Sequence, residues 1–290
     1  MNLCAIILNW CNASATITCA KSLIASGFLV NDIIIVDNFS PDNSVELLKN
    51  SLPNFNIIKN KLNSGYTGGN NFGMEVAFSM GYKAVLILNN DLEVVLNNVF
   101  FSEIASYLES KRDVLLGLPV IDFKTGKQTY PARKSRVLKN IINNIPQVDS
   151  KSSFDVICGC ALIINREMYD RVGGLNVSYF MYCEELEYSL RVKIMGGAVE
   201  CLPSTIAYVI RDDDENHIPP YFYYYTSRNL IILINSLLKK RRIFVLLFSI
   251  LSSFKESIYS GKIIAFRLTC LGIFDGLRNK FGKNSMVHTY

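Results

Sequence analysis

Five consecutive residues near the middle of the chain, Leu88-Asn89-Asn90-Asp91-Leu92, have the types and spacing of a metal site. They end a strongly apolar run, residues 84–88, which predicts a buried strand of a parallel sheet. Open α/β sheets bind ligands beyond the carboxyl ends of such strands. A carboxylate flanked by amides can hold Mg²⁺ or Mn²⁺ there, against a diphosphate. The alternative interpretation is a strand followed by an ordinary Asn/Asp turn.

Two further polar segments have the residue types of a nucleotide site. Asp37 and Asn38 end another apolar run, and this carboxylate can accept a hydrogen bond from the imide N–H of uracil or thymine. Residues 63–71, Asn-Ser-Gly-Tyr-Thr-Gly-Gly-Asn-Asn, place glycines between asparagines. Glycines let the backbone approach a ribose or phosphate closely, so we interpret this segment as ligand-binding.

A cluster of acidic residues, Glu184-Glu185-Leu186-Glu187, opens a helical pattern that continues through Arg191. A carboxylate at a helix N-terminus is stabilised as the anion, which suits a general base. The alternative is that these charges only complement the helix dipole on a solvated surface. The preceding residues, Phe180-Met181-Tyr182-Cys183, are too apolar and aromatic for a typical exposed loop and favour a pocket wall.

The elements that must position these residues alternate between strands and helices, which predicts an α/β fold with a mostly parallel sheet and right-handed crossovers. A polar, irregular stretch at residues 120–153 is expected to be a flexible excursion over the site. The expected strands are residues 3–9, 33–37, 55–59, 84–88, 156–165 and 205–210, and the expected helices are 14–26, 45–51, 166–172 and 184–195.

The C-terminal part is apolar, helical in pattern and basic. After residue 236 it has ten lysines and arginines against two carboxylates, a balance of +8, whereas the whole chain is +5. Its apolar runs at 230–238 and 243–251 are shorter than the roughly 20 residues that span a bilayer, which disfavours an integral membrane protein. From Ile263 onward apolar residues recur at helical spacing. This helix either packs on the core or lies in a membrane interface, and the basic balance favours the membrane over nucleic acid.

The numbers and spacing of cysteines and histidines bear on whether the protein has a zinc site or disulfide bonds. The eight cysteines form no CxxC pair and there are two histidines, so a zinc site is disfavoured and reduced thiols are expected. The apolar run at residues 3–8 is short and lacks a basic leader, so we expect no secretory signal and a cytoplasmic protein.

The order of these motifs resembles that of the inverting, GT-A-fold family 2 glycosyltransferases, especially their rhamnosyltransferase-like branch. The resemblance covers essentially the whole chain. It rests on Leu8-Asn9-Trp10, Val36-Asp37-Asn38-Phe39-Ser40, Asn63 to Asn71, Leu88 to Asp91, Gly173-Gly174-Leu175-Asn176, Phe180 to Arg191 and Asp275-Gly276-Leu277 with Phe281-Gly282-Lys283.

The resemblance implies a Rossmann-like GT-A domain over residues 1–225, with a nucleotide-binding half at 1–92 and an acceptor and catalytic half at 93–225. A helical membrane-associating region would follow at 226–290. Asp91 would bind the Mg²⁺ or Mn²⁺, Glu185 would be the catalytic base beside Glu184, and Arg191 would support that helix or the diphosphate. The implied nucleotide-binding residues are Asn9, Asp37, Asn38, Ser40, Asn63, Gly65, Gly69, Asn70 and Asn90.

Two positions depart from the family pattern. Glu185 stands where the family usually has Asp, and Val209 stands where it often has a metal-proximal His, for which His217 is a candidate substitute. The resemblance implies sugar transfer from a nucleotide diphosphate, with dTDP-rhamnose favoured over a UDP-hexose. The implied acceptor is a lipid-linked oligosaccharide of surface polysaccharide or O-antigen synthesis, at the inner face of the cell membrane. The departures motivate an alternative, a non-catalytic nucleotide-binding subunit of an assembly complex.

Overall fold

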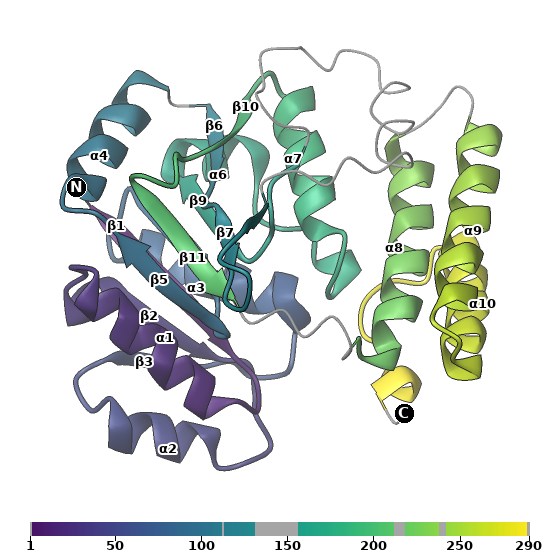
Figure 1. The fold of residues 1–290 in the computed structure, drawn as a ribbon, viewed down its shortest axis with the longest axis horizontal. Helices are drawn as coiled ribbons and strands as arrows, with labels where there is room; N and C mark the ends of the chain where they lie inside the picture. Colours follow the sequence, from purple (N-terminus) through teal and green to yellow (C-terminus); the bar gives the residue numbers. More distant parts are fainter. Residues whose placement is uncertain (1, 112, 131–155, 212–217, 238–241, 289–290) are drawn as a thin grey trace.

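The computed structural model describes residues 2–111, 113–130, 156–211, 218–237 and 242–288. An α/β body built around a twisted sheet lies beside a group of three C-terminal helices (Figure 1). The predicted α/β fold with a mostly parallel central sheet flanked by helices is confirmed.

The central sheet has seven strands in the order β10-β6-β9-β4-β1-β2-β3. Its pairs are parallel except that β9 runs antiparallel to both neighbours, β4 and β6. The strands are β1 (Leu3–Asn9), β2 (Ile33–Asp37), β3 (Asn56–Lys59), β4 (Ala84–Asn89), β6 (Val114–Gly117), β9 (Ala161–Asn165) and β10 (Ala198–Cys201).

Both faces of this sheet are covered by helices, which explains the uninterrupted apolar runs in its strands. Along β1, Leu3, Ala5 and Ile7 enter one core cluster, whereas Cys4 and Ile6 enter the cluster on the opposite face. The first cluster includes residues of α1 (Ala13–Ala25), α2 (Ser44–Ser51) and α4 (Phe100–Ser110). The second includes residues of α3 (Gly65–Ser79), α6 (Arg166–Val172) and α7 (Glu184–Ile194).

The glycine-rich segment forms the start of α3, a helix that we did not predict from the sequence. The reason is the close packing of α3 on the sheet. A Cβ atom on Gly69 would lie 2.5 Å from Cδ1 of Leu8, and one on Gly73 would lie 2.6 Å from Cγ2 of Ile6. Tertiary packing therefore overrides the weak helix propensity of glycine.

Residues 120–130, expected to belong to a flexible excursion, instead contribute to a second sheet of order β5-β11-β7-β8. This expectation was wrong because residues 120–122 pair with a strand some ninety positions later in the chain. Residues 131–153 of the expected excursion lie outside the described part of the chain. The strands are β5 (Leu92–Leu96), β7 (Val120–Asp122), β8 (Gln128–Tyr130) and β11 (Ala207–Arg211).

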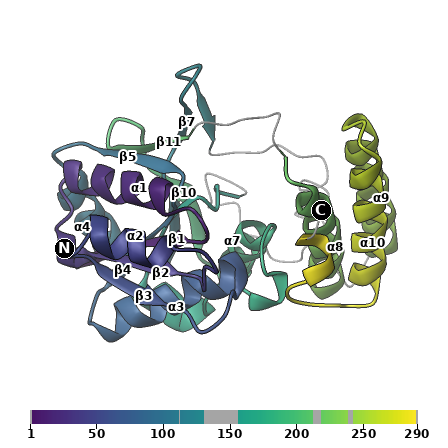
Figure 2. The same ribbon diagram turned by 90° about the horizontal axis from the view of Figure 1, so that it is seen from below.

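The C-terminal helices are α8 (Pro220–Leu237), α9 (Arg242–Tyr259) and α10 (Ile263–Leu277). Helix α8 packs on the α/β body, where Ile232 and Leu233 join Tyr179 and Leu190 in one core cluster. The expected boundary at residues 225/226 therefore falls inside a helix that belongs to this interface. Figure 2 shows α9 and α10 on the far side of α8 from the sheet.

Helix α10 divides its apolar residues between the core and the surface. Leu268 and Ile273 are buried, whereas other large apolar side chains of the same helix are exposed. The buried face fits the alternative in which the helix packs on the rest of the protein, and the membrane-interface alternative stays a prediction. Among the described residues, no helix has both the length and the apolar character that a bilayer crossing requires. The exposed apolar residues of α10 are Ile263, Phe266, Phe274 and Leu277.

Candidate active site

A cleft of about 340 Å³ opens at the carboxyl ends of β1, β2 and β4. This is the position in an open α/β sheet at which ligands bind. Five residues that we predicted as site residues lie on its wall, namely Asn38, Asn63, Gly65, Asn90 and Asp91. The other lining residues are Leu8, Trp10, Asn12, Tyr66, Asn89, Phe180, Met181, Tyr221 and His288.

Asn38 organises the wall where the nucleotide was predicted to bind. Its Nδ2 donates to Oδ1 of Asn63 at 3.2 Å and to the carbonyl of Gly65 at 3.0 Å. Its Oδ1 accepts from Asn60 Nδ2 at 3.1 Å and from the backbone N–H of Ser64 at 3.3 Å. One buried amide thereby fixes the turn between β3 and α3, and with it the position of the lining residues.

Five other predicted nucleotide-binding residues are buried rather than on the cleft wall, namely Asn9, Asp37, Ser40, Gly69 and Asn70. Asp37 is fully buried and accepts from Asn9 Nδ2 at 2.9 Å and from the backbone N–H of Ser40 at 3.0 Å. Asn70 is also fully buried and donates to the carbonyl of Tyr66 at 2.9 Å. Gly69 packs against Leu8 under the wall. These residues therefore support the wall from behind in this structure.

The opposite wall comes from residues 179–183, which pack directly on the start of α3. Gly65 has φ of +73°, and a Cβ atom there would lie 2.3 Å from the Phe180 carbonyl oxygen, so only glycine fits. The same carbonyl accepts the backbone N–H of Thr67 at 3.2 Å. Of the four residues predicted to form a pocket wall, Phe180 and Met181 line the cleft, whereas Tyr182 and Cys183 are not among its lining residues.

This wall has a left-handed backbone that α8 holds in place. Phe180, Tyr182 and Cys183 have φ of 67°, 65° and 65°, a region that side chains with a Cβ disfavour. Nδ2 of Asn229 donates to the carbonyls of Tyr179, Met181 and Tyr182 at 3.1, 2.8 and 2.8 Å. Those three hydrogen bonds offset the strain of the segment that leads into α7.

Arg228, the neighbour of Asn229, ties three parts of the chain together. It is buried, and its guanidinium donates to the carbonyls of Tyr179 at 2.8 Å and Gly282 at 2.6 Å. The rings of Tyr224 and Tyr225 lie 5.3 and 4.8 Å from its guanidinium carbon. Sequence reasoning missed both Arg228 and Asn229. The available signal was an arginine, the one charged residue of the mostly apolar helical run 221–237, followed directly by an asparagine.

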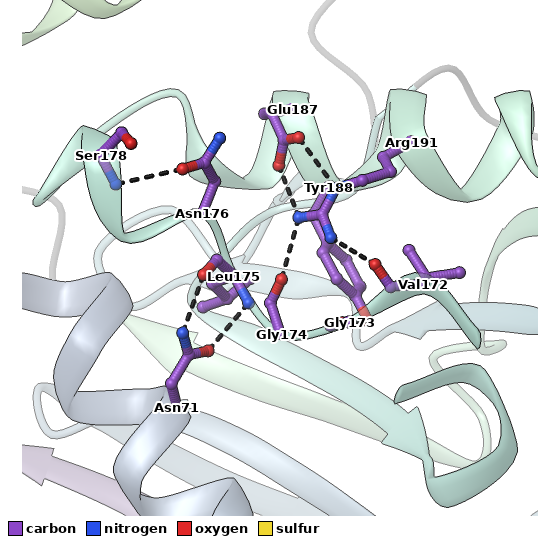
Figure 3. Close-up of polar contacts among 10 residues, drawn as sticks. All are labelled: Asn71, Val172, Gly173, Gly174, Leu175, Asn176, Ser178, Glu187, Tyr188 and Arg191. Carbon is purple, nitrogen blue, oxygen red and sulfur yellow. Dashed lines mark hydrogen bonds and ion pairs between the residues drawn. The ribbon is translucent and has the colours of Figure 1, made fainter. Parts of the chain in front are cut away.

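Arg191 connects the acidic helix α7 to the turn after α6 (Figure 3) and is not among the residues that line the cleft. It forms a two-point ion pair with Glu187, with N–O distances of 2.8 Å. It also donates to the carbonyls of Val172 at 2.6 Å and Gly174 at 2.9 Å, at the turn after α6. Of the two roles implied for Arg191, support of the helix or of the diphosphate, the structure shows contacts for the first.

The acidic pair at the start of α7 lies behind the cleft wall. Tyr66 lines the cleft, and its hydroxyl donates to the carbonyl of Gly159. A Cβ atom on Gly159 would lie 3.1 Å from Cβ of Glu185. Burial, and then the negative charge of Glu185, raise the pKa of Glu184 well above its ordinary value. These causes favour the protonated form of Glu184, and Glu185 is the candidate base.

The oxygen atoms at the end of β4 fit a hard divalent cation. Asp91 lines the cleft beside Asn89 and Asn90. Oδ1 of Asn89 is buried and has no hydrogen-bond partner among the described residues, so one amide acceptor is available for a ligand. No cluster of three or more His, Cys, Asp or Glu exists within those residues. This donor set fits Mg²⁺ or Mn²⁺ held jointly with phosphate oxygens rather than in a full protein cage.

Comparison with known proteins decides the family. The sequence profile described as "Glycosyl transferase family 2" matches residues 5–173, more than half of the chain. The chain belongs to glycosyl transferase family 2. The matched residues include the predicted nucleotide and metal residues, and the match ends before the acidic helix α7.

Curated relatives agree with this family. The low-salt glycan biosynthesis hexosyltransferase Agl10 of Haloferax volcanii is 29% identical over 178 residues, which cover 57% of this chain and 54% of the relative. The rhamnosyltransferase WbbL of Escherichia coli is 26% identical over 132 residues, covering 41% and 49%. The chain thus spans about half the length of each of these two relatives.

Solved structures share the fold. S. aureus TarS 1-349 superposes with a TM-score of 0.59 at 15% identity, covering all of this chain and 83% of that one. GalNAc-T7, solved with UDP, GalNAc and Mn²⁺, gives a TM-score of 0.61 at 14% identity, covering 96% of this chain and 56% of that one. At this identity the likeness concerns the fold alone.

The structure also brings residues to the cleft that sequence reasoning did not select. Tyr221 lies near the end of the predicted GT-A domain, and His288 comes from the C-terminal part, which we had interpreted as membrane-associating. His217, our candidate for the missing family histidine, lies outside the described residues. Periodicity could not have identified His288, because its place depends on the chain returning to the body after α10.

The raised pKa of Glu184 predicts a pH-dependent stability. A carboxyl group whose pKa is higher in the folded state stabilises the fold while it is protonated. That contribution is lost as the pH rises from the ordinary carboxyl pKa of 4.5 through the raised pKa of Glu184 in the folded protein. We therefore expect Glu184→Gln, which stays neutral, to have a higher Tm than the wild type at about pH 8. This advantage should shrink as the pH is lowered, as followed by thermal unfolding with circular dichroism.

The exposed Glu46 on α2 provides a matched control, since surface substitutions of this kind change stability little. A Glu184→Gln protein that is less stable than the wild type at every pH would show that the buried carboxyl is not the protonated member of the pair.

Proposed function

We propose that this protein is an inverting glycosyltransferase that moves one sugar from a nucleotide diphosphate donor to a lipid-linked oligosaccharide. One observation carries the proposal. The cleft at the strand ends combines an asparagine-rich wall and a metal-competent carboxylate with an acidic helix start behind its other wall. Membership of glycosyl transferase family 2 supports the reaction class.

In the proposed reaction, the acceptor hydroxyl attacks the anomeric carbon of the donor sugar. The bond between that carbon and the diphosphate oxygen breaks, and the configuration inverts. Glu185 accepts the hydroxyl proton as the general base. Glu184, kept protonated by burial, leaves the pair with one negative charge rather than two. Arg191 holds the helix that presents both carboxyl groups.

The leaving nucleotide diphosphate would lie against the end of β4. Asp91 and the available oxygen of Asn89 would hold a Mg²⁺ or Mn²⁺ ion there. When bound, such an ion neutralises charge that develops on the leaving diphosphate. The asparagine-rich wall around Asn38 and Asn63 would bind the nucleoside through amide hydrogen bonds.

For the donor, we propose dTDP-rhamnose first and a UDP-hexose second. The similarity to a protein named rhamnosyltransferase supports the first, and the similarity to a protein named hexosyltransferase is compatible with both. Donor turnover by the purified protein, with dTDP-rhamnose, UDP-glucose, UDP-galactose and UDP-N-acetylglucosamine, distinguishes them.

A lipid-linked acceptor is supported by the surface of the C-terminal helices. On α9, Ile243, Leu247 and Leu251 recur every four residues and are 74%, 57% and 67% exposed. Such an apolar stripe bordered by basic residues is typical of a helix that lies in an anionic membrane interface. We therefore propose a peripheral location on the inner face of the cell membrane, with a role in surface polysaccharide synthesis such as that of O-antigen. The exposed basic residues nearby are Lys255, Lys262, Arg267, Arg278, Lys280 and Lys283.

The rival function is a nucleotide-binding subunit without transfer activity. The longer Glu185 in place of the usual Asp favours it. Binding of nucleotide sugars without turnover of any donor and acceptor would support this rival.

We expect substitution of Asp91 to weaken nucleotide binding and substitution of Glu185 to lower the rate of transfer. Asp91→Asn should weaken the binding of UDP or dTDP in the presence of Mn²⁺, because the cation loses a charged ligand. Glu185→Gln should lower kcat by about 10²–10⁴-fold and leave nucleotide affinity unchanged, because the base acts only on the acceptor. Trp10 lines the cleft and is the single tryptophan, so its fluorescence reports nucleotide binding without turnover. Wild-type turnover in Glu185→Gln would exclude this residue as the base.

The exposed stripe on α9 predicts membrane binding that depends on two leucines. Burying one leucine side chain is worth about 1.5–3 kcal/mol, so Leu247→Ser with Leu251→Ser should weaken vesicle binding at least about tenfold. The measurement is co-sedimentation with phosphatidylcholine vesicles, with and without phosphatidylglycerol. The matched control is Leu29→Ser with Leu62→Ser, two leucines of the α/β body that are 69% and 59% exposed. Equal losses in both pairs, or none, would contradict the assignment of this surface.

A further inference from the structure

The C-terminal turn η3 (Ser285–His288) returns the chain to the cleft. His288 lines the cleft together with Asp91, although the two residues lie far apart in the sequence. The ring centroid of His288 lies 5.1 Å from that of Tyr221, 5.7 Å from that of Tyr225 and 5.9 Å from that of Phe180. Three aromatic rings from two different parts of the chain thus hold the imidazole in place.

The hydrogen bonds of Tyr225 are the basis for assigning the ring nitrogen of His288 that carries the proton. Its hydroxyl oxygen accepts the backbone N–H of Asn284 at 3.0 Å and lies 3.0 Å from Nε2 of His288. Among the described residues, Nε2 is the one acceptor within reach of the phenol proton, so we assign the tautomer in which Nε2 accepts it. Burial, and then the positive charge of Lys283, lower the pKa of His288, which favours the neutral ring. A neutral imidazole that accepts at Nε2 carries its own proton on Nδ1.

This Nδ1–H has no acceptor among the described residues, although His288 lies on the wall of the cleft. The described lining of the cleft contains no lysine or arginine. A diphosphate bound there needs N–H donors beside any cation at Asp91, because its oxygens carry negative charge that increases as the sugar leaves.

We propose that His288 donates its Nδ1–H to a diphosphate oxygen of the nucleotide sugar and is thus a donor-binding residue supplied by the C-terminal turn. This inference rests on the proposed function. It assigns to the C-terminal part a direct role in the cleft, in addition to any role at a membrane. Tyr225 is the positioning residue, because it directs the imidazole proton toward the ligand.

The test compares two replacements that differ in where they present an N–H. The amide of asparagine can place its N–H near the position of Nδ1, whereas the longer glutamine places it near Nε2. A hydrogen bond to a charged group is worth about 10–100-fold in affinity, so His288→Gln should weaken the binding of UDP and dTDP by that factor. His288→Asn should stay within about threefold of the wild type.

Trp10 fluorescence measures these affinities in the full chain, with uridine and thymidine as phosphate-free probes. We expect His288→Gln to bind UDP and dTDP more weakly and to bind uridine and thymidine as tightly as the wild type does. A general loss of structure would weaken the binding of all four compounds. Tyr225→Phe should give a smaller loss of the same kind. The control is Met286→Ala, an exposed residue of the same turn, with Tm measured for every variant.

The binding results distinguish a failure of the proposed role of His288 from a failure of the proposed function. A wild-type protein that binds neither UDP nor dTDP would overturn the proposed function. A wild-type protein that binds them, with His288→Gln binding equally well, would overturn only the role of His288. A loss that appears with Mn²⁺ and disappears with EDTA would also overturn it, because His288 would then act as a metal ligand. A loss confined to the acceptor KM would assign His288 to the acceptor instead.

Discussion

Three hydrogen bonds from one amide side chain hold the backbone on which the cleft depends. Asn229 donates to the carbonyls of three residues in a segment that has three positive φ angles. Left-handed backbone costs about 1–2 kcal/mol per residue when a Cβ is present. Without these bonds the segment would relax, and the cleft wall and the start of α7 would move with it. Arg228 strengthens the same junction, since its contacts connect α8 to Tyr179 and to the residues after α10.

This junction gives the C-terminal helices two roles. Helix α8 fixes the wall of the cleft on one side, and α9 and α10 present exposed apolar and basic residues on the other. A surface that enters a membrane interface through α9 would then place the cleft at a defined height above the lipid headgroups. That geometry suits an acceptor whose reactive sugar is attached to a lipid, because both substrates meet close to the membrane.

The positions of the polar residues that end the strands were predictable, because they depend on the local pattern of apolar and polar residues. Asn90 and Asp91 follow an apolar run whose length and composition identify a buried strand, and they lie on the cleft as expected. The orientation of other polar residues was not predictable in the same way. Asp37 has a suitable residue type and follows a strand, yet its carboxylate faces Asn9 and Ser40 in the interior. Which side of a strand end faces the ligand is decided by the packing of neighbouring turns.

The sequence alone determined the class of the fold, the strands that carry the nucleotide and metal motifs, the carboxylates available for chemistry and the basic, apolar character of the C-terminal part. Each of these follows from residues close together in the chain, where periodicity and charge act directly. The tertiary structure decided that the glycine-rich segment is a helix packed on β1, and that Asn229 supports Phe180. It also decided that His288 faces the cleft. These features arise from contacts between residues far apart in sequence, which only the packing of the folded chain brings together.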